Sequence, residues 1–137
     1  ELIRNNSTAD TPNTADIVQR MQALMSDGVG PLRTQAGLAT ALDAIEEMTK
    51  TLGDRPFGQA GSFDMQRLDW FDLRNMLTVA RAVAQAASLR TESRGAHQRE
   101  DFPGLLPQWR VNQEIRLDTK GLTIDQVPAS PIEVAAQ

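Results

Sequence analysis

The longest uninterrupted helical signal in the sequence lies between Gly61 and Gly95, where neither glycine nor proline occurs. Because these two residue types are the strongest helix breakers, such a span can carry one long helix. Small and aliphatic side chains recur within it at spacings of three and four residues, which places them on one helical face. These residues are Leu73, Met76, Leu77, Ala80, Val83, Ala84 and Ala87. We therefore predict a helix from about Asp69 to Ser93 whose small residues allow a neighbouring helix to approach closely.

Two shorter amphipathic helices precede the long one. The first is predicted to begin at Ala15, with an N-cap at residues 13–14, and to end at Gly28. The second is predicted to end at Gly53, and its apolar face consists of Leu38, Leu42, Ile45, Met48 and Leu52. Three such helices predict a mostly α fold, a three-helix bundle similar to a spectrin repeat, over residues 15–101.

Composition and charge limit the kind of core that the chain can form and the kinds of partner that it can bind. Of its 137 residues, 40% are apolar and only 4% aromatic, so the core must be built from aliphatic side chains. The formal net charge of −4 disfavours nucleic-acid binding, which requires a basic face. The absence of cysteine excludes disulfides, a thiolate nucleophile and cysteine-ligated clusters. No apolar run approaches the ~20 residues of a membrane helix, so we expect no direct membrane insertion.

After Pro103 the apolar period changes from that of a helix to the two-residue period of a strand. The alternating residues are Trp109, Val111, Gln113, Ile115 and Leu117. A turn at residues 118–121 can bring Leu122 and Ile124 back beside them, which predicts a loop and β-hairpin over residues 102–126. An isolated hairpin is marginally stable in water, so it should lie against the helices or a partner. The ends of the chain, residues 1–14 and 127–137, are predicted to be a flexible lead-in and a flexible tail.

The segment "RTESRGAHQREDFP", residues 90–103, follows the long apolar stripe. Extending the stripe beyond Ala87 gives Arg90, Thr91 and Arg94, so the buried face becomes cationic. Burying unpaired guanidinium groups is costly, and the core of the bundle should therefore stop near Ala87. Gly95 is expected to close the helix in the left-handed conformation.

Two interpretations of this charged segment are open from the residues alone. The first, which the residues alone favour, is a solvated helix end whose ion pairs contribute little to stability. In the second, Arg90, Arg94 and Arg99 contact carboxylates on another surface, since a guanidinium group can bind a carboxylate through two parallel hydrogen bonds.

Catalysis by this segment is disfavoured. His97 is the only histidine of the chain, and Glu100 or Asp101 could serve as its carboxylate partner. However, the chain has no cysteine nucleophile, and nothing in the spacing brings Ser93 within hydrogen-bond reach of the imidazole. A zinc site would need further nitrogen or sulfur ligands that the sequence does not supply.

The charged segment also resembles a known signature. The pattern Arg90-x-Glu92-Ser93-Arg94-Gly95-Ala96-His97-x-Arg99-x-Asp101-Phe102-Pro103 is similar to the motif in the C-terminal domain of the succinate dehydrogenase/fumarate reductase flavoprotein family. L-aspartate oxidases carry a related "RESRG-H…DYP" form. The order of helices, motif, tryptophan and hairpin resembles that domain from about Ala15 to Pro128.

This resemblance implies a parent enzyme that uses FAD to move two electrons between succinate and fumarate, or to carry out a related oxidation. In that family the flavin-binding and substrate-binding residues belong to upstream domains. We therefore expect this chain to be a fragment of a longer protein that binds no FAD, holds no metal and is inactive by itself, with no catalytic residue of its own.

The resemblance also implies partners for the charged segment. They are the upstream flavin-binding domain of the same protein and an iron–sulfur subunit, in an assembly that is cytoplasmic and peripheral to the inner membrane. This favours the second interpretation of the segment, as a surface that faces a partner. The candidate interface residues are Arg90, Glu92, Arg94, His97, Arg99 and Asp101.

One departure from the family pattern leaves alternatives open. The run after Trp109 reads Arg110-Val111-Asn112, where ordinary dicarboxylate members show a Lys-His-Thr-like run. The C-terminal domain of an L-aspartate oxidase, or of another divergent FAD oxidoreductase, is therefore an alternative. A stand-alone helical protein-interaction module is a third.

Overall fold

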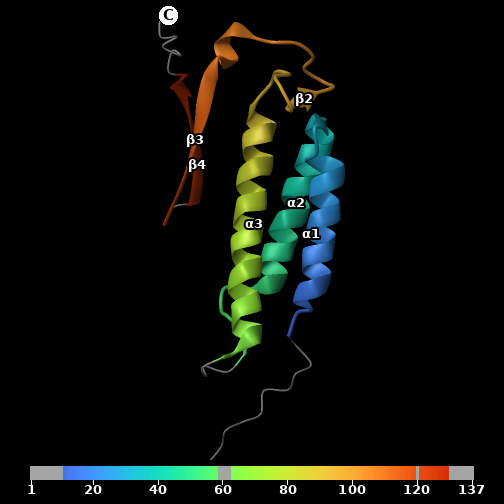
Figure 1. The fold of residues 1–137 in the computed structure, drawn as a ribbon, viewed down its shortest axis with the longest axis vertical. Helices are drawn as coiled ribbons and strands as arrows, with labels where there is room; N and C mark the ends of the chain where they lie inside the picture. Colours follow the sequence, from blue (N-terminus) through green and yellow to red (C-terminus); the bar gives the residue numbers. More distant parts are fainter. Residues whose placement is uncertain (1–10, 59–62, 120, 130–137) are drawn as a thin grey trace, which may run out of the picture.

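Three α-helices and a β-hairpin are the main elements of the part of the chain that the computed structural model describes, residues 11–58, 63–119 and 121–129. The helices are α1 (Thr14–Gly28), α2 (Gln35–Leu52) and α3 (Met65–Leu89). They lie side by side, and the hairpin stands beside α3 (Figure 1). The predicted mostly α fold, with three helices followed by a β-hairpin, is confirmed.

Each helix begins at a polar residue that caps its free amide groups. Asn13, Thr34 and Asp64 precede α1, α2 and α3 in extended backbone conformations. In each case the side-chain oxygen accepts a hydrogen bond from the amide three residues later, at 3.2, 3.0 and 3.2 Å respectively. Such caps stabilise a helix by about 1 kcal/mol, so they fix the three starting points in the sequence.

The core lies between the three helices and consists mainly of aliphatic side chains. Of the predicted stripe on α3, the buried members are Leu73, Leu77, Ala80, Ala84 and Ala87. Ala87 is the last buried residue of the helix, as predicted. Met76 and Val83 are exposed, so their predicted burial is wrong; they lie on the edge of the stripe. The sequence pattern also missed Trp70, which is buried and donates its indole N–H to the Leu52 carbonyl at 3.3 Å.

The long helix α3 lies four residues earlier in the chain than predicted. It begins at Met65 because Asp64 caps it, and it ends at Leu89 because Arg90 turns to extended backbone. Gly95 does adopt a positive φ of 58°, but it lies in the turn between Arg94 and His97 and does not close the helix. The prediction for this end of α3 is therefore wrong.

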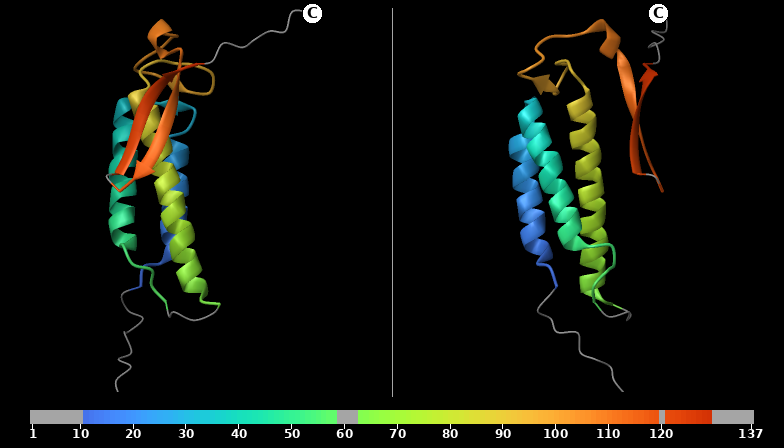
Figure 2. Two further views of the ribbon diagram at one scale, coloured as in Figure 1. Left: turned by 90° about the vertical axis from the view of Figure 1, so that its left-hand side faces the viewer. Right: turned by 180° about the vertical axis from the view of Figure 1, so that it is seen from behind.

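Two small sheets complete the fold. The hairpin pairs β3 (Val111–Asp118) with β4 (Gly121–Pro128) in antiparallel register, with Asp118 opposite Gly121. It runs alongside α3 in both views of Figure 2, and Gln113 donates a side-chain hydrogen bond to the Ala86 carbonyl at 3.1 Å. The second sheet, which was not predicted, pairs β1 (Leu32–Arg33) with β2 (Gln98–Arg99) in parallel.

The two ends of the chain were predicted to be flexible, and most of both segments lies outside the described residues. Within the described part, α1 begins one residue earlier than predicted and β4 continues two residues further, to Pro128. Among the described helices, none has the length and apolar character required to cross a membrane.

Candidate functional site

The charged segment folds into a compact structure at the end of the bundle where the α1–α2 connection meets the end of α3. We call residues 90–101, together with Arg33 and Gln35, the clasp. Two backbone hydrogen bonds of 2.9 Å join its halves: the Gln98 amide donates to the Pro31 carbonyl, and the Glu100 amide donates to the Arg33 carbonyl. These bonds form the β1–β2 pair, so the clasp ties together segments more than 60 residues apart.

Arg99 lies at the centre of the clasp and is only 1% exposed. Its guanidinium group donates to the carbonyls of Ala87, Ser88 and Arg90, at 3.1, 3.2 and 3.3 Å. The last carbonyls of a helix have no partner within the helix. The Arg99 side chain supplies those partners, and its charge is favourable at the negative end of the α3 dipole.

The remaining donors of Arg99 bind acceptors from two other parts of the clasp. Both carboxylate oxygens of Asp101 accept from it, at 2.7 and 2.8 Å, and the Gln35 side-chain oxygen accepts at 3.0 Å. Asp101 also accepts from the Gln35 amide at 2.9 Å. The hydrogen bond from Arg99 is the main reason why the pKa of Asp101 lies well below its usual range. Arg99 and Asp101 thus form a bidentate ion pair that also joins the start of α2 to the end of α3.

Glu92 is the second buried charge, with an exposure of 0%. Its carboxylate accepts hydrogen bonds from Arg90 at 2.7 Å, from Arg94 at 2.6 and 3.1 Å, and from the Leu106 amide at 2.8 Å. The hydrogen bonds from Arg94 make the largest contribution to lowering the pKa of Glu92 to about 2, and the bonds from Leu106 and Arg90 act in the same direction against burial. The carboxylate therefore stays ionised inside the fold.

Arg90 connects the clasp to the hairpin. Besides Glu92, its guanidinium group donates to the carbonyls of Trp109 and Val111, at 3.0 and 2.9 Å, and it lies 5.1 Å from the centre of the Trp109 ring. The Trp109 indole N–H in turn donates to the Thr91 hydroxyl at 3.0 Å. A hairpin that would be marginal alone is thereby fixed to the end of the bundle.

His97 has a partner on each ring nitrogen. Nδ1 lies 2.5 Å from Arg33 Nη1, and Nε2 lies 3.1 Å from the Arg90 carbonyl oxygen. Because arginine can only donate and a carbonyl can only accept, the ring is a neutral imidazole protonated on Nε2. Burial is the main cause of the lowered pKa of His97, and the nearby Arg33, Arg90 and Arg99 lower it further. Ser93 bonds instead to the backbone of Arg99 and Phe102, so its hydroxyl is not paired with the imidazole.

These contacts revise the predicted interface. Glu92 and Arg99 are buried with partners inside the chain, so they are neither solvated nor available to a partner surface, and that prediction is wrong for both. Arg94 is the most accessible cation of the predicted set, with 40% of its side chain exposed, and its role in an interface stays a prediction. The sequence reasoning missed Arg33 and Gln35, because no local pattern connects them to a motif more than 60 residues away.

The chemistry of the clasp is that of a structural element. The carboxylates of Glu92 and Asp101 are bound by guanidinium groups, the imidazole is hydrogen-bonded on both nitrogens, and the serine hydroxyl contacts backbone. Within residues 11–58, 63–119 and 121–129, no three side chains of His, Cys, Asp or Glu gather closely enough to hold a metal ion. The clasp therefore holds the bundle end and the hairpin in one fixed arrangement.

The described part of the chain is thus a three-helix bundle that is closed by the clasp and followed by a hairpin. Residues 18–131 match the family described as "Fumarate reductase flavoprotein C-term". The chain belongs to this family, whose members are FAD-dependent flavoproteins. The resemblance seen in the charged segment is therefore confirmed.

Relatives of known sequence and structure agree with this assignment. An uncharacterised FAD-dependent oxidoreductase of Methanocaldococcus jannaschii is 36% identical over 107 residues, which are 78% of this chain and 19% of the relative. One of the subunits of the fumarate reductase (CoM/CoB) of Methanothermobacter marburgensis is 35% identical over 110 residues, which are 80% of this chain and 19% of the relative. The structure of Mycobacterium smegmatis Sdh1 in complex with UQ1 superposes with a TM-score of 0.77 at 28% identity, covering 90% of this chain and 21% of that chain. The chain thus spans about a fifth of the length of the relatives it matches.

Proposed function

We propose that this chain is the non-catalytic C-terminal domain of an FAD-dependent enzyme that interconverts succinate and fumarate. The observation that carries the proposal is the family match over residues 18–131, which includes the whole clasp. In this proposal the FAD and the substrate bind to the parent polypeptide outside this chain. The chain packs on the flavin-binding domain and contacts an iron–sulfur subunit, in the cytoplasm at the inner membrane.

An exposed apolar face supports the packing part of this proposal. Val79 and Val83 on α3, and Ile115 and Leu117 on β3, are all exposed. Gln113, Ile115 and Leu117 are spaced two residues apart, so their side chains lie on the same face of β3. The Gln113 side chain bonds to α3, and this face is therefore turned toward the helix. Exposed apolar side chains that gather on neighbouring elements are typical of a protein interface, and these four residues support that role. The clasp supports the same role, because it fixes the angle between hairpin and α3.

The experiment uses the full-length polypeptide that contains this chain. We expect the purified protein to carry FAD, seen by its visible absorbance, and to act on succinate and fumarate. Turnover of L-aspartate in their place would support the L-aspartate oxidase alternative. A natural reading frame that begins near Glu1, with no flavin-binding region, would contradict the proposal and support a stand-alone interaction module.

A pair of variants of similar exposure tests the packing surface. Val79, 62% exposed, lies on the apolar face, whereas Leu32, 67% exposed, lies in the α1–α2 connection. In the full-length protein Val79→Arg should reduce FAD retention and activity, whereas Leu32→Arg should leave both close to those of the wild type. Equal effects of the two substitutions would contradict the assigned surface. Thermal melting of the 137-residue chain with each substitution checks that neither acts by unfolding the domain.

A further inference from the structure

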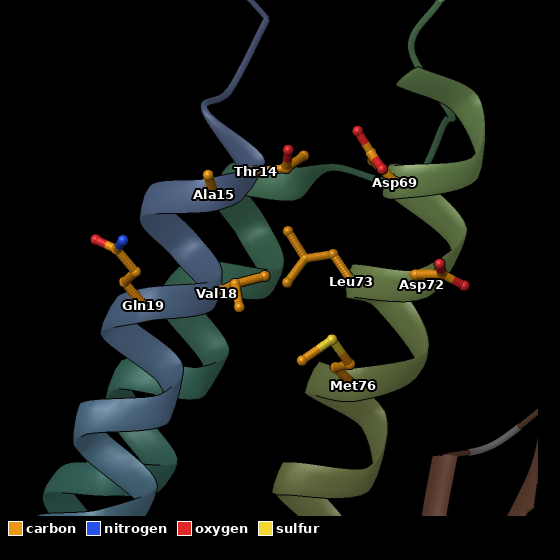
Figure 3. A pocket seen from close by; sticks show the side chains of 8 residues that line it. All are labelled: Thr14, Ala15, Val18, Gln19, Asp69, Asp72, Leu73 and Met76. Carbon is orange, nitrogen blue, oxygen red and sulfur yellow. The ribbon is translucent and has the colours of Figure 1, made fainter. Parts of the chain in front are cut away.

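A groove opens between the first turns of α1 and those of α3 (Figure 3). These turns lie at the end of the bundle opposite β2 (Figure 1). Its volume is about 380 Å³, at the lower end of the range for binding pockets. Figure 3 shows the side chains of Val18, Leu73 and Met76 pointing into the space between the two helices. Leu73 is buried and Met76 is exposed, so the groove has an apolar floor that an incoming side chain can reach.

Two carboxylates of α3 border this apolar floor. Asp69 stands above Leu73, and Asp72 lies on the outer side of the same helix (Figure 3). Both residues are exposed. They are three residues apart, so two like charges share one face of the helix, a spacing that is unfavourable for the helix itself.

Within the described part of the chain, no cation forms an ion pair with these two carboxylates. The residues one helical turn away from them are, apart from the two aspartates themselves, uncharged: Met65, Gln66, Leu68, Leu73, Asn75 and Met76. The arginines nearby have other partners: Arg67 and Arg74 lie over the rings of Phe71 and Trp70, at 5.8 and 5.4 Å, and Arg20 of α1 pairs with Asp16 at 3.8 Å.

We propose that this groove binds a segment of a second polypeptide in which an arginine or lysine adjoins an aliphatic side chain. The aliphatic side chain would lie over Val18, Leu73 and Met76, and the cation would bind Asp69 and Asp72. Charge complementarity argues for this occupant, because a cation relieves the repulsion between the two carboxylates and gains two partners. The inference goes beyond the proposed function, since it assigns a separate surface and a separate partner.

A library of random 12-residue peptides displayed on phage, selected on the immobilised 137-residue chain, tests the proposal by the chemistry of the peptides that bind. We expect enrichment of sequences with Arg or Lys next to Leu, Ile or Met. The affinity of the enriched peptide for the chain is then measured by fluorescence anisotropy. No enrichment, or enrichment of sequences that lack a cation, overturns the proposal.

Matched variants assign the binding to the groove. The double variant Asp69→Asn, Asp72→Asn keeps the shape of both side chains and should weaken binding by roughly fivefold to tenfold, as expected for the loss of two partly exposed ion pairs. Asp43→Asn, an exposed carboxylate on α2, is the control and should change the affinity less than twofold. Equal affinity of the double variant and the wild type overturns the proposal.

Methyl NMR of methionine locates the bound peptide. The Met76 signal should shift on titration, whereas that of Met48, buried in α2, should stay in place. Shifts confined to other methionines overturn the site. If the chain self-associates through the groove in sedimentation experiments, or if the full-length polypeptide fails to bind the peptide because its own residues cover the groove, the assignment to a second polypeptide is wrong.

Discussion

Arg99 illustrates how a buried charge can be tolerated at the level of one residue. Removing a guanidinium group from water is costly, and attraction to one carboxylate often fails to offset that cost. Besides the first oxygen of Asp101, the Arg99 guanidinium group has five further acceptors. They are three carbonyls at the end of α3, the Gln35 side-chain oxygen and the second oxygen of Asp101. The guanidinium group therefore supplies donors to the last carbonyls of α3 and to the Asp101 carboxylate, so Arg99 both caps the helix and forms an ion pair.

The first prediction concerns this residue. Arg99→Ala should lower the free energy of unfolding by about 3–5 kcal/mol, because it removes the side-chain donor of the helix carbonyls and the charged partner of Asp101. Urea denaturation of the 137-residue chain measures the change. Arg116→Ala is the control; Arg116 pairs with Glu114 on the exposed face of the hairpin, and its loss should cost less than about 1 kcal/mol. Equal effects would mean that the clasp does not stabilise the fold.

At the scale of secondary-structure elements, α3 presents different faces to different neighbours. Its buried stripe packs against α1 and α2, whereas Val79 and Val83 are exposed. Both valines lie within two turns of Ala86, whose carbonyl accepts the hydrogen bond from Gln113 of the hairpin. A small side chain such as Ala84 lets the helices approach closely, and it is fully buried. The helix therefore tolerates substitutions on one face and is sensitive to them on another.

The second prediction compares these two faces. Ala84→Glu should destabilise the chain by about 3 kcal/mol or more, or prevent folding, since it buries an unpaired carboxylate and overfills the contact between helices. Val79→Glu, on the exposed face of the same helix, should change stability by less than about 1 kcal/mol. Circular dichroism during urea denaturation separates the two outcomes. A stable Ala84→Glu variant would contradict the helix packing described above.

The third prediction concerns the attachment of the hairpin. Arg90→Gln removes the hydrogen bonds to the carbonyls of Trp109 and Val111, so the amides of β3 and β4 should exchange with solvent roughly tenfold faster or more. Arg94→Gln is the matched control, because it also removes a partner of Glu92 but has no contact with the hairpin among those observed. NMR measurement of the amide exchange rates of β3 and β4 in the wild type and in both variants tests this prediction. Equally fast exchange in both variants would assign the effect to Glu92 rather than to the hairpin.

At the scale of the whole molecule, the ionised clasp makes stability depend on pH. Glu92 and Asp101 have pKa values below those of free side chains, and so does His97. For each group the unfolded chain binds its proton at a higher pH than the folded chain does. Each contribution to stability is therefore fully present above the pKa of the unfolded chain and is lost as the pH falls below it.

The fourth prediction follows from these signs. Stability should be highest above pH ~7, decline below about pH 6.5 as His97 is protonated in the unfolded chain, and decline further below about pH 4.3 as Glu92 and Asp101 contribute. Thermal melting at a series of pH values measures the profile. His97→Gln should remove the decline that begins at about pH 6.5 but keep the one at lower pH. A wild-type melting temperature that does not change between pH 7 and 3 would contradict the role assigned to the clasp.

Local patterns in the sequence were sufficient to predict the three helices and the β-hairpin, but not the β1–β2 pair. An apolar period of three to four residues predicts a helix and a period of two residues predicts a strand, and both patterns depend only on neighbouring residues in the sequence. The ends of α3 were predicted less well, because they depend on a cap at Asp64 and on the departure of the chain at Arg90. The motif was recognised from residues 90–103 alone, and the chain belongs to the family that the motif indicated.

The state of the charges was decided only by the tertiary structure. Whether Glu92 and Arg99 are solvated, paired with a partner or buried depends on residues that are distant in the sequence, namely Gln35 for Arg99 and Leu106 for Glu92. The electrostatic cost of burial is set by the neighbours in space, and a helical pattern contains no information about them. The sequence by itself therefore determined the three helices, the hairpin and the family to which the chain belongs. The tertiary structure decided that Glu92 and Arg99 are buried, where they bind partners within the chain.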